Sequence, residues 1–433
     1  MPEVLTASRV MTGDETVTDG AVVIGDRTVD WVGPAGALPA EHLSVPRADY
    51  PGSTIMPGLT DSHVHLAFDG GPNPAARMRA ETGEQQLMLM LRSARELLGI
   101  GVTTARDLGS RAYLAVAVRD AIAAGLARGP RLVVAGCPIT VTGGHCWFMG
   151  GEADSEDDLR RLVRTHHKHG ADLIKVMSTG GFMTTGSAPW YAQFTTAQLA
   201  VIVEEAARVD KPVAAHAHGT EGIRRAVEAG VTTIEHCSFV TDTNERQFSE
   251  SLAARIAERG MFVCPTISAS APYIAELTGI EVGAHVKPMH DMGVRIIAGT
   301  DAGIDNNPHH QYVGGLEYLV TLGFQPEQVL AMATTEAAAA LGLGATTGRL
   351  APGYDADLIV VRGDPQADIA ALRDLLRVIA RGRDYVPDSG RFDVSAPGSP
   401  YASLDHAVDL RLVTEATRRR DPAQPGRRPP YST

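Results

Sequence analysis

Cysteine is scarce in this chain, which has four among 433 residues. They are Cys137, Cys146, Cys237 and Cys264, and no two of them form a Cys-x-x-Cys pair. Scattered cysteines are not the pattern of a disulfide framework or of a thiolate zinc motif. They fit a reducing compartment, and we expect a cytoplasmic protein.

Long apolar runs and an excess of positive charge are also missing. No apolar run approaches the roughly 18 residues of a membrane helix. The first residues have neither the basic nor the apolar region of a secretory signal. The formal net charge of −12 argues against a general nucleic-acid or anionic-membrane surface. We therefore expect a soluble protein that acts on a small molecule, with no nucleic acid and no membrane as partner.

The composition that is present suits a large globular enzyme. Apolar residues make up 44% of the chain and charged residues 21%, which is enough for a sizeable core in one large domain or two. The 45 glycines and 26 prolines indicate many short turns, as an alternating strand–helix protein needs.

Residues 53–344 alternate apolar runs of strand length with alanine- and leucine-rich helical stretches. The strand-like runs are 55–66, 102–107, 132–139, 173–177, 213–218, 233–237, 262–267 and 295–300. The helical stretches include 85–98, 112–127, 155–169, 196–209, 220–229, 246–259 and 328–341. Apolar strands alternating with helices indicate a parallel sheet covered on both faces. About eight such repeats predict an α/β fold of the (β/α)8 TIM-barrel type.

Both ends of the chain have a different sequence pattern, which is typical of β-strands. Short β-branched runs separated by turn signals fill residues 4–33, and similar runs return in 346–384. We expect residues 1–56 and 345–385 to build one small β-sandwich domain beside a catalytic barrel of residues 57–344. Residues 386–433 lose periodicity and contain a basic, proline-rich stretch, which predicts a flexible tail.

The stretch 54–66 holds the first candidate for chemistry, with Asp61, His63 and His65 at the end of an apolar run. In a strand, residues two apart face the same side, so both histidines can converge while Val64 packs the other way. Neutral imidazole is the commonest transition-metal ligand. An isolated His-x-His pair is equally compatible with solvated or core histidines. The other candidate ligands along the chain are needed to distinguish a metal site from these alternatives.

Lys175 lies within the otherwise apolar run 173–177. A buried, unpaired lysine has a lowered pKa, because burial disfavours the charged amine. Such an amine can form a Schiff base, or react with CO2 to give a carbamate whose two oxygens can bridge two metal ions. A lysine paired in a salt bridge at the strand end is the equally good alternative.

Further ligand-type residues stand at the ends of later predicted strands. The run 213–218 ends in a second His-x-His pattern with His216 and His218, the next run ends with His236, and the last barrel run is followed by Asp301. Any one of these could be structural. Six potential ligands at the ends of five predicted strands together indicate a metal site.

These residues resemble, in order and strand placement, the metal-dependent amidohydrolase superfamily. The opening 58–65 and the closing stretch 348–358 are also similar to it. The stretches 213–222 and 226–236 are most similar to its prolidase and imidazolonepropionase-like branch. The resemblance covers roughly residues 4–385, and the family suggests a homo-oligomer.

The resemblance implies a binuclear site with two divalent cations of the zinc type. His63 and His65 would bind one cation and His216 and His236 the other, with carboxylated Lys175 bridging them. Asp301 would ligate the first cation and transfer protons. Two cations can lower the pKa of a bridging water toward neutrality and polarise a carbonyl.

Three residues are candidates for substrate contacts. His145 follows two glycines after the third strand, and relatives carry a histidine in a similar loop that contacts the substrate carbonyl. We expect it to stabilise the oxyanion. His218 shares the face of His216 and can touch substrate or orient a ligand, and we expect it not to bind metal. Tyr191 lies in the long loop after the fourth strand and either lines the site or packs in that loop.

The sequence favours a binuclear hydrolase of an amide or peptide C–N bond, in an N-acyl amino acid, a dipeptide or a related small amide. Opening of a cyclic amide by the same site is a second possibility. A mononuclear deaminase is less favoured, since such enzymes typically place glutamate three residues after the fifth-strand histidine, where this chain has Gly219. A non-enzymatic scaffold is disfavoured because every ligand position is filled.

Overall fold

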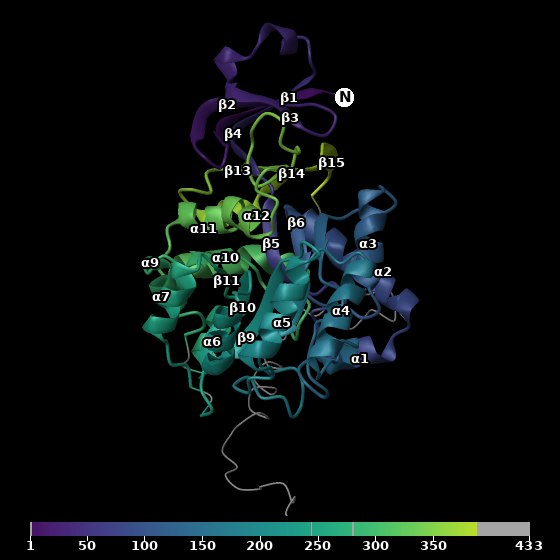
Figure 1. The fold of residues 1–433 in the computed structure, drawn as a ribbon. Helices are drawn as coiled ribbons and strands as arrows, with labels where there is room; N and C mark the ends of the chain where they lie inside the picture. Colours follow the sequence, from purple (N-terminus) through teal and green to yellow (C-terminus); the bar gives the residue numbers. More distant parts are fainter. Residues whose placement is uncertain (1, 244, 279–280, 388–433) are drawn as a thin grey trace, which may run out of the picture.

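The computed structural model describes residues 2–243, 245–278 and 281–387. Their strands form one seven-stranded sheet and two parallel sheets of five and three strands. Figure 1 shows the seven-stranded sheet at one end of the molecule and the parallel sheets with their helices at the other. The predicted α/β fold with parallel sheets is therefore confirmed.

The seven-stranded sheet joins the two ends of the described chain. Its order is β15-β14-β13-β4-β1-β2-β3, and the join is the antiparallel pairing of β13 with β4. Two facing sheets, which a sandwich requires, are not shown, because these strands belong to one hydrogen-bonded sheet. The strands are β1 (Glu3–Met11), β2 (Thr16–Ile24), β3 (Val29–Pro34), β4 (Arg47–Pro57), β13 (Leu358–Arg362), β14 (Leu375–Ala380) and β15 (Arg383–Tyr385).

The parallel sheets contain the eight strands of the central region, in the orders β5-β6-β7 and β12-β11-β10-β9-β8. Every residue of β5, β6, β8, β9 and β10 is buried, as expected for strands covered on both faces. The strands are β5 (Leu59–Val64), β6 (Val102–Asp107), β7 (Arg131–Val134), β8 (Ile174–Met177), β9 (Val213–Gly219), β10 (Thr233–Val240), β11 (Phe262–Cys264) and β12 (Arg295–Ile296).

Backbone hydrogen bonds join the two parallel sheets at both edges. On one side, Met177 N in β8 donates to Ile139 O beyond the end of β7, over 2.8 Å. On the other, His65 N, just after β5, donates to Ala302 O beyond β12, also over 2.8 Å. The first and last strands of the central region are therefore neighbours at their carboxyl ends.

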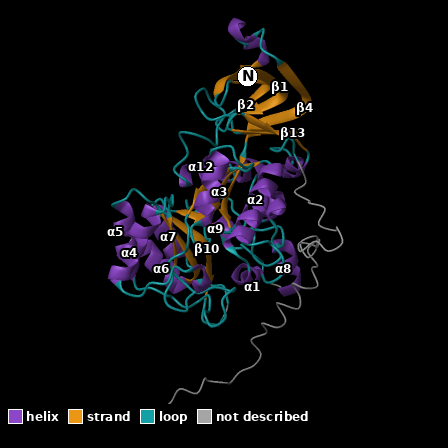
Figure 2. Cartoon of the chain, turned by 90° about the vertical axis from the view of Figure 1, so that its right-hand side faces the viewer, coloured by secondary structure: helices purple, strands orange, loops and turns teal. Residues whose placement is uncertain are grey.

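The helices lie outside these strands, as Figure 2 shows. Several begin with a side-chain cap, for example Thr82 on α2 and Ser155 on α4. The helices are α1 (Pro74–Ala80), α2 (Gly83–Gly99), α3 (Leu114–Ala123), α4 (Glu156–Lys168), α5 (Thr196–Ala207), α6 (Thr220–Ala229), α7 (Glu250–Glu258), α8 (Ala271–Thr278), α9 (Val286–Asp291), α10 (Tyr312–Thr321), α11 (Pro326–Met332) and α12 (Thr335–Ala340). In the ranges described, no helix has the length and apolarity needed to cross a bilayer.

Some predicted elements are shorter in the structure. The helix expected over 328–341 is interrupted between α11 and α12, where the Thr334 hydroxyl donates to Leu330 O and Thr334 is not helical. The third strand ends at Val134 rather than at residue 139, because Gly136 has a φ of +75°. The last strand covers only two residues, after which the chain bonds to the end of β5 instead. The predicted tail, 386–433, lies almost wholly outside the described residues.

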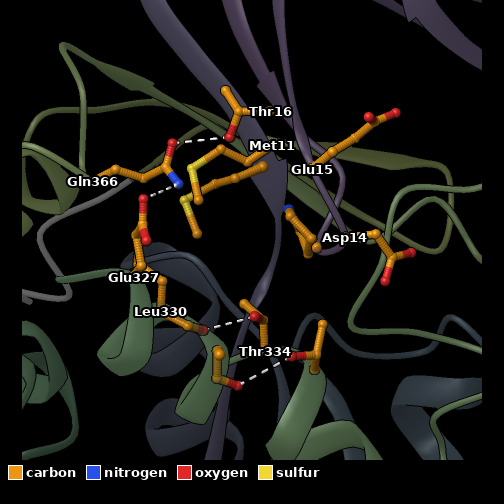
Figure 3. A pocket seen from close by; sticks show the side chains of 13 residues that line it. Met11, Asp14, Glu15, Thr16, Glu327, Leu330, Thr334 and Gln366 are labelled. Atoms are coloured by element: carbon orange, nitrogen blue, oxygen red, sulfur yellow. Dashed lines mark hydrogen bonds between the residues drawn. The ribbon is translucent and has the colours of Figure 1, made fainter. Parts of the chain in front are cut away.

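A cavity of about 380 Å³ separates the seven-stranded sheet from α11 and α12. Figure 3 shows Gln366 bridging across it: Thr16 Oγ1 donates to Gln366 Oε1 over 2.9 Å, and Gln366 Nε2 donates to Glu327 Oε1 over 3.2 Å. Met56 and Pro57, which precede β5, also line it. The cavity therefore lies at the amino end of β5, whereas the predicted ligands are at the carboxyl end.

Candidate metal centre

The predicted ligands lie at or just beyond the carboxyl ends of the parallel strands. β5 carries His63, β8 carries Lys175, β9 carries His216 and His218, and β10 carries His236, while His65 and Asp301 follow β5 and β12. Asp301 is brought beside β5 by a hydrogen bond from its N–H to His63 O over 2.8 Å. His236 and Asp301 have positive φ values of 67° and 61°. Strained residues of this kind cluster at functional sites.

The histidine rings form one continuous cluster. The ring centroid of His63 lies 5.4 Å from that of His65 and 5.2 Å from that of His236. His236 in turn lies 4.5 Å from His216, and His216 lies 4.6 Å from His145. The structure thus brings together all the histidines that the sequence predicts as ligands, and places His145 at their edge.

One nitrogen of each of three predicted ligand histidines is held by a neighbour. His63 Nδ1 lies 2.9 Å from Glu235 Oε2, His236 Nδ1 lies 2.8 Å from Thr266 Oγ1, and His216 Nε2 lies 2.9 Å from Gly180 O. Such contacts fix the orientation of a ligand ring and select its tautomer. They leave Nε2 of His63 and His236, and Nδ1 of His216, as the nitrogens that can bind a cation.

Two buried atoms of the predicted metal ligands lack a hydrogen-bond partner among the described residues, His63 Nε2 and Asp301 Oδ1. They lie 3.3 Å apart, and His65 Nε2 lies 3.2 Å from the same Asp301 oxygen. Buried polar atoms are normally satisfied. A divalent cation held by two imidazoles and a carboxylate would satisfy them, so these residues fit a metal ion.

Two groups of ligand atoms in this cluster are compact enough to hold an ion. One atom each from His63, His236 and Asp301 lie within 4.8 Å of one another, and so do one atom each from His216, His218 and His236. His218 is therefore placed among the candidate ligands, although the sequence analysis expected it to have another role. Its Nδ1 lies 2.7 Å from Ser238 Oγ.

The charge state of these side chains suits metal binding. Burial lowers the pKa of His216 and of His236 well below the usual histidine value, and the neighbouring histidines add to the effect. Both rings are therefore neutral at pH 7, the form that binds metal. Burial alone would raise the pKa of Asp301, but His63 and His65 hold it well below its usual value, so it stays ionised.

Lys175 is 1% exposed and lies among these groups. Burial lowers the pKa of its amine, while the charges of Glu235 and Asp301 oppose that shift. Its charge in turn contributes to the lowered pKa of His145, His216 and His236. The predicted bridging lysine therefore lies within electrostatic reach of these three histidines and of Asp301.

Glu235 is a site residue whose role the sequence analysis did not find. Besides contacting His63, it accepts from Arg106 Nη2 over 2.9 Å, and both side chains are almost fully buried. Burial alone would raise the pKa of Glu235, but Arg106 and His63 lower it to about 2. The Arg106 guanidinium is therefore buried in the protein and held by Glu235. The only signal was the position of Glu235 next to His236.

His145 is packed against the loop after β8. Gly181 lies so close that a Cβ there would approach the imidazole of His145 to 2.4 Å. His145 Nδ1 is buried, and no hydrogen bond to it is found within the described ranges. Burial lowers the pKa of His145 to about 3, so its ring is neutral at pH 7. It can donate one N–H toward a group held at the cluster.

Two glycines in the loop after β8 have their backbone N–H groups bonded within the loop. Gly180 N donates to Tyr191 O and Gly181 N to Ser187 O. Tyr191 is 57% exposed, and its ring contacts that of Trp190, with 5.9 Å between centroids. Phe182 instead reaches the cluster, with its ring 5.0 Å from His218.

His166 is buried although it lies on a charged helix. Its charged neighbours are typical of a solvated helical face, but its side chain is fully buried. His166 Nε2 lies 2.6 Å from Cys137 O, and Nδ1 lies 3.2 Å from the Tyr113 hydroxyl. His166 belongs to the buried face of α4 with Leu159 and Val163, while the charged residues of the helix lie on its other face.

The amidohydrolase family model matches residues 54–383 of this chain. The protein belongs to the amidohydrolase family. It is accordingly a hydrolase acting on carbon–nitrogen bonds, and the family membership predicted from the sequence is confirmed. Amidohydrolases are generally metal-dependent, which agrees with the histidine clusters described above.

Two curated relatives extend over most of this amidohydrolase. Ochratoxinase of Aspergillus niger is 29% identical over 412 residues, covering 86% of this chain and 83% of the relative. Imidazolonepropionase of Ruegeria sp. is 26% identical over 392 residues, covering 82% and 89%.

Solved structures of similar proteins also match most of this chain. A Xaa-Pro dipeptidase with bound methionine superposes with a TM-score of 0.80 at 29% identity, covering 89% of this chain and all of that one. The Aspergillus niger ochratoxinase structure gives a TM-score of 0.78 at 28% identity, covering 89% and 96%. The predicted similarity to prolidases and imidazolonepropionases is therefore confirmed.

Proposed function

We propose that this amidohydrolase is a binuclear metal-dependent enzyme that hydrolyses the amide C–N bond of a small N-acyl amino acid, dipeptide or related amide. The observation that carries the proposal is the convergence of five ligand-type side chains at the carboxyl ends of the strands, where β8 also carries Lys175, a buried lysine with a lowered pKa. A single-cation site has no need of that lysine, whereas a carbamate formed on it offers oxygens to two cations.

The predicted ligand residues would bind two cations. His63, His65 and Asp301 would hold one and His216 and His236 the other. A carbamate on Lys175, formed when CO2 adds to the neutral amine with release of a proton, would lie between them. When bound, such cations lower the pKa of water and polarise a carbonyl.

The side chains that remain supply proton transfer and oxyanion stabilisation. Asp301 is ionised and can accept a proton from the attacking water and return it to the leaving amine nitrogen. Water thus adds to the carbonyl carbon, the C–N bond breaks, and a carboxylic acid and an amine are released. The neutral ring of His145 can donate its N–H to the carbonyl oxygen as negative charge develops there.

We also propose that the eight parallel strands form a closed (β/α)8 barrel. The hydrogen bonds from Met177 to Ile139 and from His65 to Ala302 support it, since they link the two sheets at both edges. In such barrels the chemistry is carried at the carboxyl ends of the strands, where these ligands lie.

Opening of a cyclic amide is the second candidate function. It uses the same residues, and the similarity to imidazolonepropionase favours it. Only the substrate separates it from the first.

A substrate panel tests the proposal. Zinc-loaded protein is assayed for amine release from N-acetyl amino acids and dipeptides, and for ring opening of cyclic amides. We expect hydrolysis of an acyclic amide, lost on treatment with a chelator and restored by zinc. Release of ammonia from heterocyclic amines, with no amide cleaved, would show that the enzyme is a deaminase instead.

A further inference from the structure

Gln193 lies in the loop after β8, and its side chain makes every hydrogen bond that a primary amide allows. Its Oε1 accepts from the backbone N–H of His145 over 2.7 Å and from the Ser187 hydroxyl over 3.2 Å. Its Nε2 donates to Met177 O over 2.8 Å and to Thr140 Oγ1 over 3.0 Å. A primary amide has two donors and two acceptor sites, so the protein occupies all of them.

Two of these partners fix the orientation of the Gln193 amide. A backbone N–H can only donate and a backbone carbonyl can only accept, so the amide oxygen must face His145 and the nitrogen must face Met177. Gln193 N also donates to Ser178 O over 2.9 Å, which anchors the backbone of Gln193 just beyond the end of β8. Strand β8 therefore sets the position of this side chain.

The bond from His145 to Gln193 joins two loops that are distant in sequence. His145 follows β7, and Gln193 comes 48 residues later, after β8. A second bond joins the same loops one residue further on, from Cys146 N to Thr184 Oγ1 over 2.9 Å. A Cβ at Gly144 would come within 2.7 Å of Gln193 Oε1. The backbone at His145 therefore lies directly against the Gln193 amide.

This anchored backbone carries the imidazole of His145 to the ligand cluster. The centroid of the His145 ring lies 4.6 Å from that of His216, and His145 is 4% exposed. His145 Nδ1 has no hydrogen-bond partner in the part of the chain that the structure describes. The direction of the ring therefore depends on its backbone and on the packing of Gly181 against it.

We propose that Gln193 is a positioning residue for amide hydrolysis: its side chain fixes the backbone of His145 at the end of β8 and thereby aims the imidazole at the carbonyl oxygen of the substrate. The inference rests on the proposed function, in which His145 stabilises the developing oxyanion. Because the hydrogen-bonding positions of the Gln193 amide are all occupied by protein, Gln193 acts through His145 and not on the substrate itself.

A double-mutant cycle with His145→Ala tests this role. We measure kcat and KM for N-acetyl-L-leucine on the zinc-loaded wild type, Gln193→Met, His145→Ala and the double variant. Methionine is similar in length to glutamine and has neither amide group. We expect Gln193→Met to lower kcat by about 10- to 100-fold, with KM and zinc content unchanged, because a displaced imidazole stabilises the oxyanion less. In the His145→Ala background the same replacement should lower kcat no further.

Glu152→Met is the matched control. Glu152 Oε1 accepts from Gly143 N over 2.8 Å, so this variant also removes a side-chain acceptor from a backbone N–H, two residues before His145. It should keep the wild-type kcat. An equal loss of kcat from Gln193→Met in both backgrounds would overturn the inference, because Gln193 would then act independently of His145. A wild-type kcat in Gln193→Met would overturn it as well.

Gln193→Glu is the second variant, for the case in which Gln193→Met does not fold. It retains an oxygen for the N–H of His145 but places a second oxygen against Met177 O. We expect a smaller fall in kcat, which should again be absent from the His145→Ala background. A fall that persists there would count against the inference.

The ring nitrogen resonances of His145 separate this inference from the proposed function. They are recorded by NMR on zinc-loaded protein with isotope-labelled histidine, and the signals missing from His145→Ala identify them. We expect them to shift in Gln193→Met and not in Glu152→Met, while the other histidine signals stay in place. Unshifted His145 signals, or equal shifts of all the histidines, would refute the inference whether or not any amide is cleaved. Failure of the wild type to cleave any amide counts against the proposed function alone.

Discussion

At the scale of single residues, the site depends on side chains behind the ligands. Glu235 contacts His63 Nδ1 and is paired with Arg106, which also donates to Ser62 O over 2.7 Å. Because Ser62 precedes His63 in β5, this network positions one ligand through both its ring and its backbone. Partners of this kind set the tautomer and basicity of a metal-binding histidine.

Replacing Glu235 with glutamine should therefore weaken the metal site. We expect Glu235→Gln to lower zinc affinity by about 10- to 100-fold, measured by competition with a chromophoric chelator. It should also lower stability, by up to about 3–5 kcal/mol, because Arg106 keeps a buried charge without its anion.

Asp357→Asn is the control for the stability effect. Asp357 is 1% exposed and pairs with Arg131 at 2.9 Å, at the amino end of the strands. This variant should lose stability and keep its zinc affinity. Equal zinc affinity in Glu235→Gln and wild type would show that Glu235 serves the fold alone.

At the scale of elements, the loop after β8 acts as one wall of the site. Over three residues, Gly180 O holds His216, Gly181 packs against His145, and Phe182 contacts His218. The glycine at 181 is required sterically, since any side chain there would meet the imidazole. The loop thus couples the position of the proposed oxyanion donor to the position of one ligand.

Gly181→Ala tests this coupling. The added methyl would approach His145 Cε1 and Nε2 to 2.4 Å, so the imidazole must move. We expect kcat to fall about 100-fold, comparable to loss of an oxyanion donor, with zinc content unchanged. Gly83→Ala is the control, because a methyl there meets nothing within 4 Å. Loss of zinc from Gly181→Ala would instead show that the loop positions the metal ligands. A wild-type kcat in Gly181→Ala would show that His145 takes no part in the reaction.

At the scale of the whole molecule, the sequence predicts the alternation of strands and helices and the residues at the strand ends. Both follow from local patterns, the length of apolar runs and the two-residue repeat that puts His63 and His65 on one face. The break at Thr334 between α11 and α12 was not predicted, because it depends on a hydrogen bond from the Thr334 hydroxyl to Leu330 O that no apolar pattern indicates.

Contacts between segments that are far apart along the chain could not be predicted from the sequence. Glu235 and Arg106 are 129 residues apart, and their pairing depends on the closeness of β6 and β10. The burial of His166 could not be predicted either, because its neighbours along α4 are charged while its own side chain contacts Cys137 O.

The central claim is that Lys175 joins two cations in one site, and metal content tests it most directly. Zinc per chain is measured by atomic absorption on protein produced with zinc and bicarbonate, for the wild type and for Lys175→Ala. We expect about two ions per chain in the wild type, at most one in the variant, and loss of most of the activity. One ion per chain in both proteins, or a fully metallated and active variant, would contradict the binuclear site.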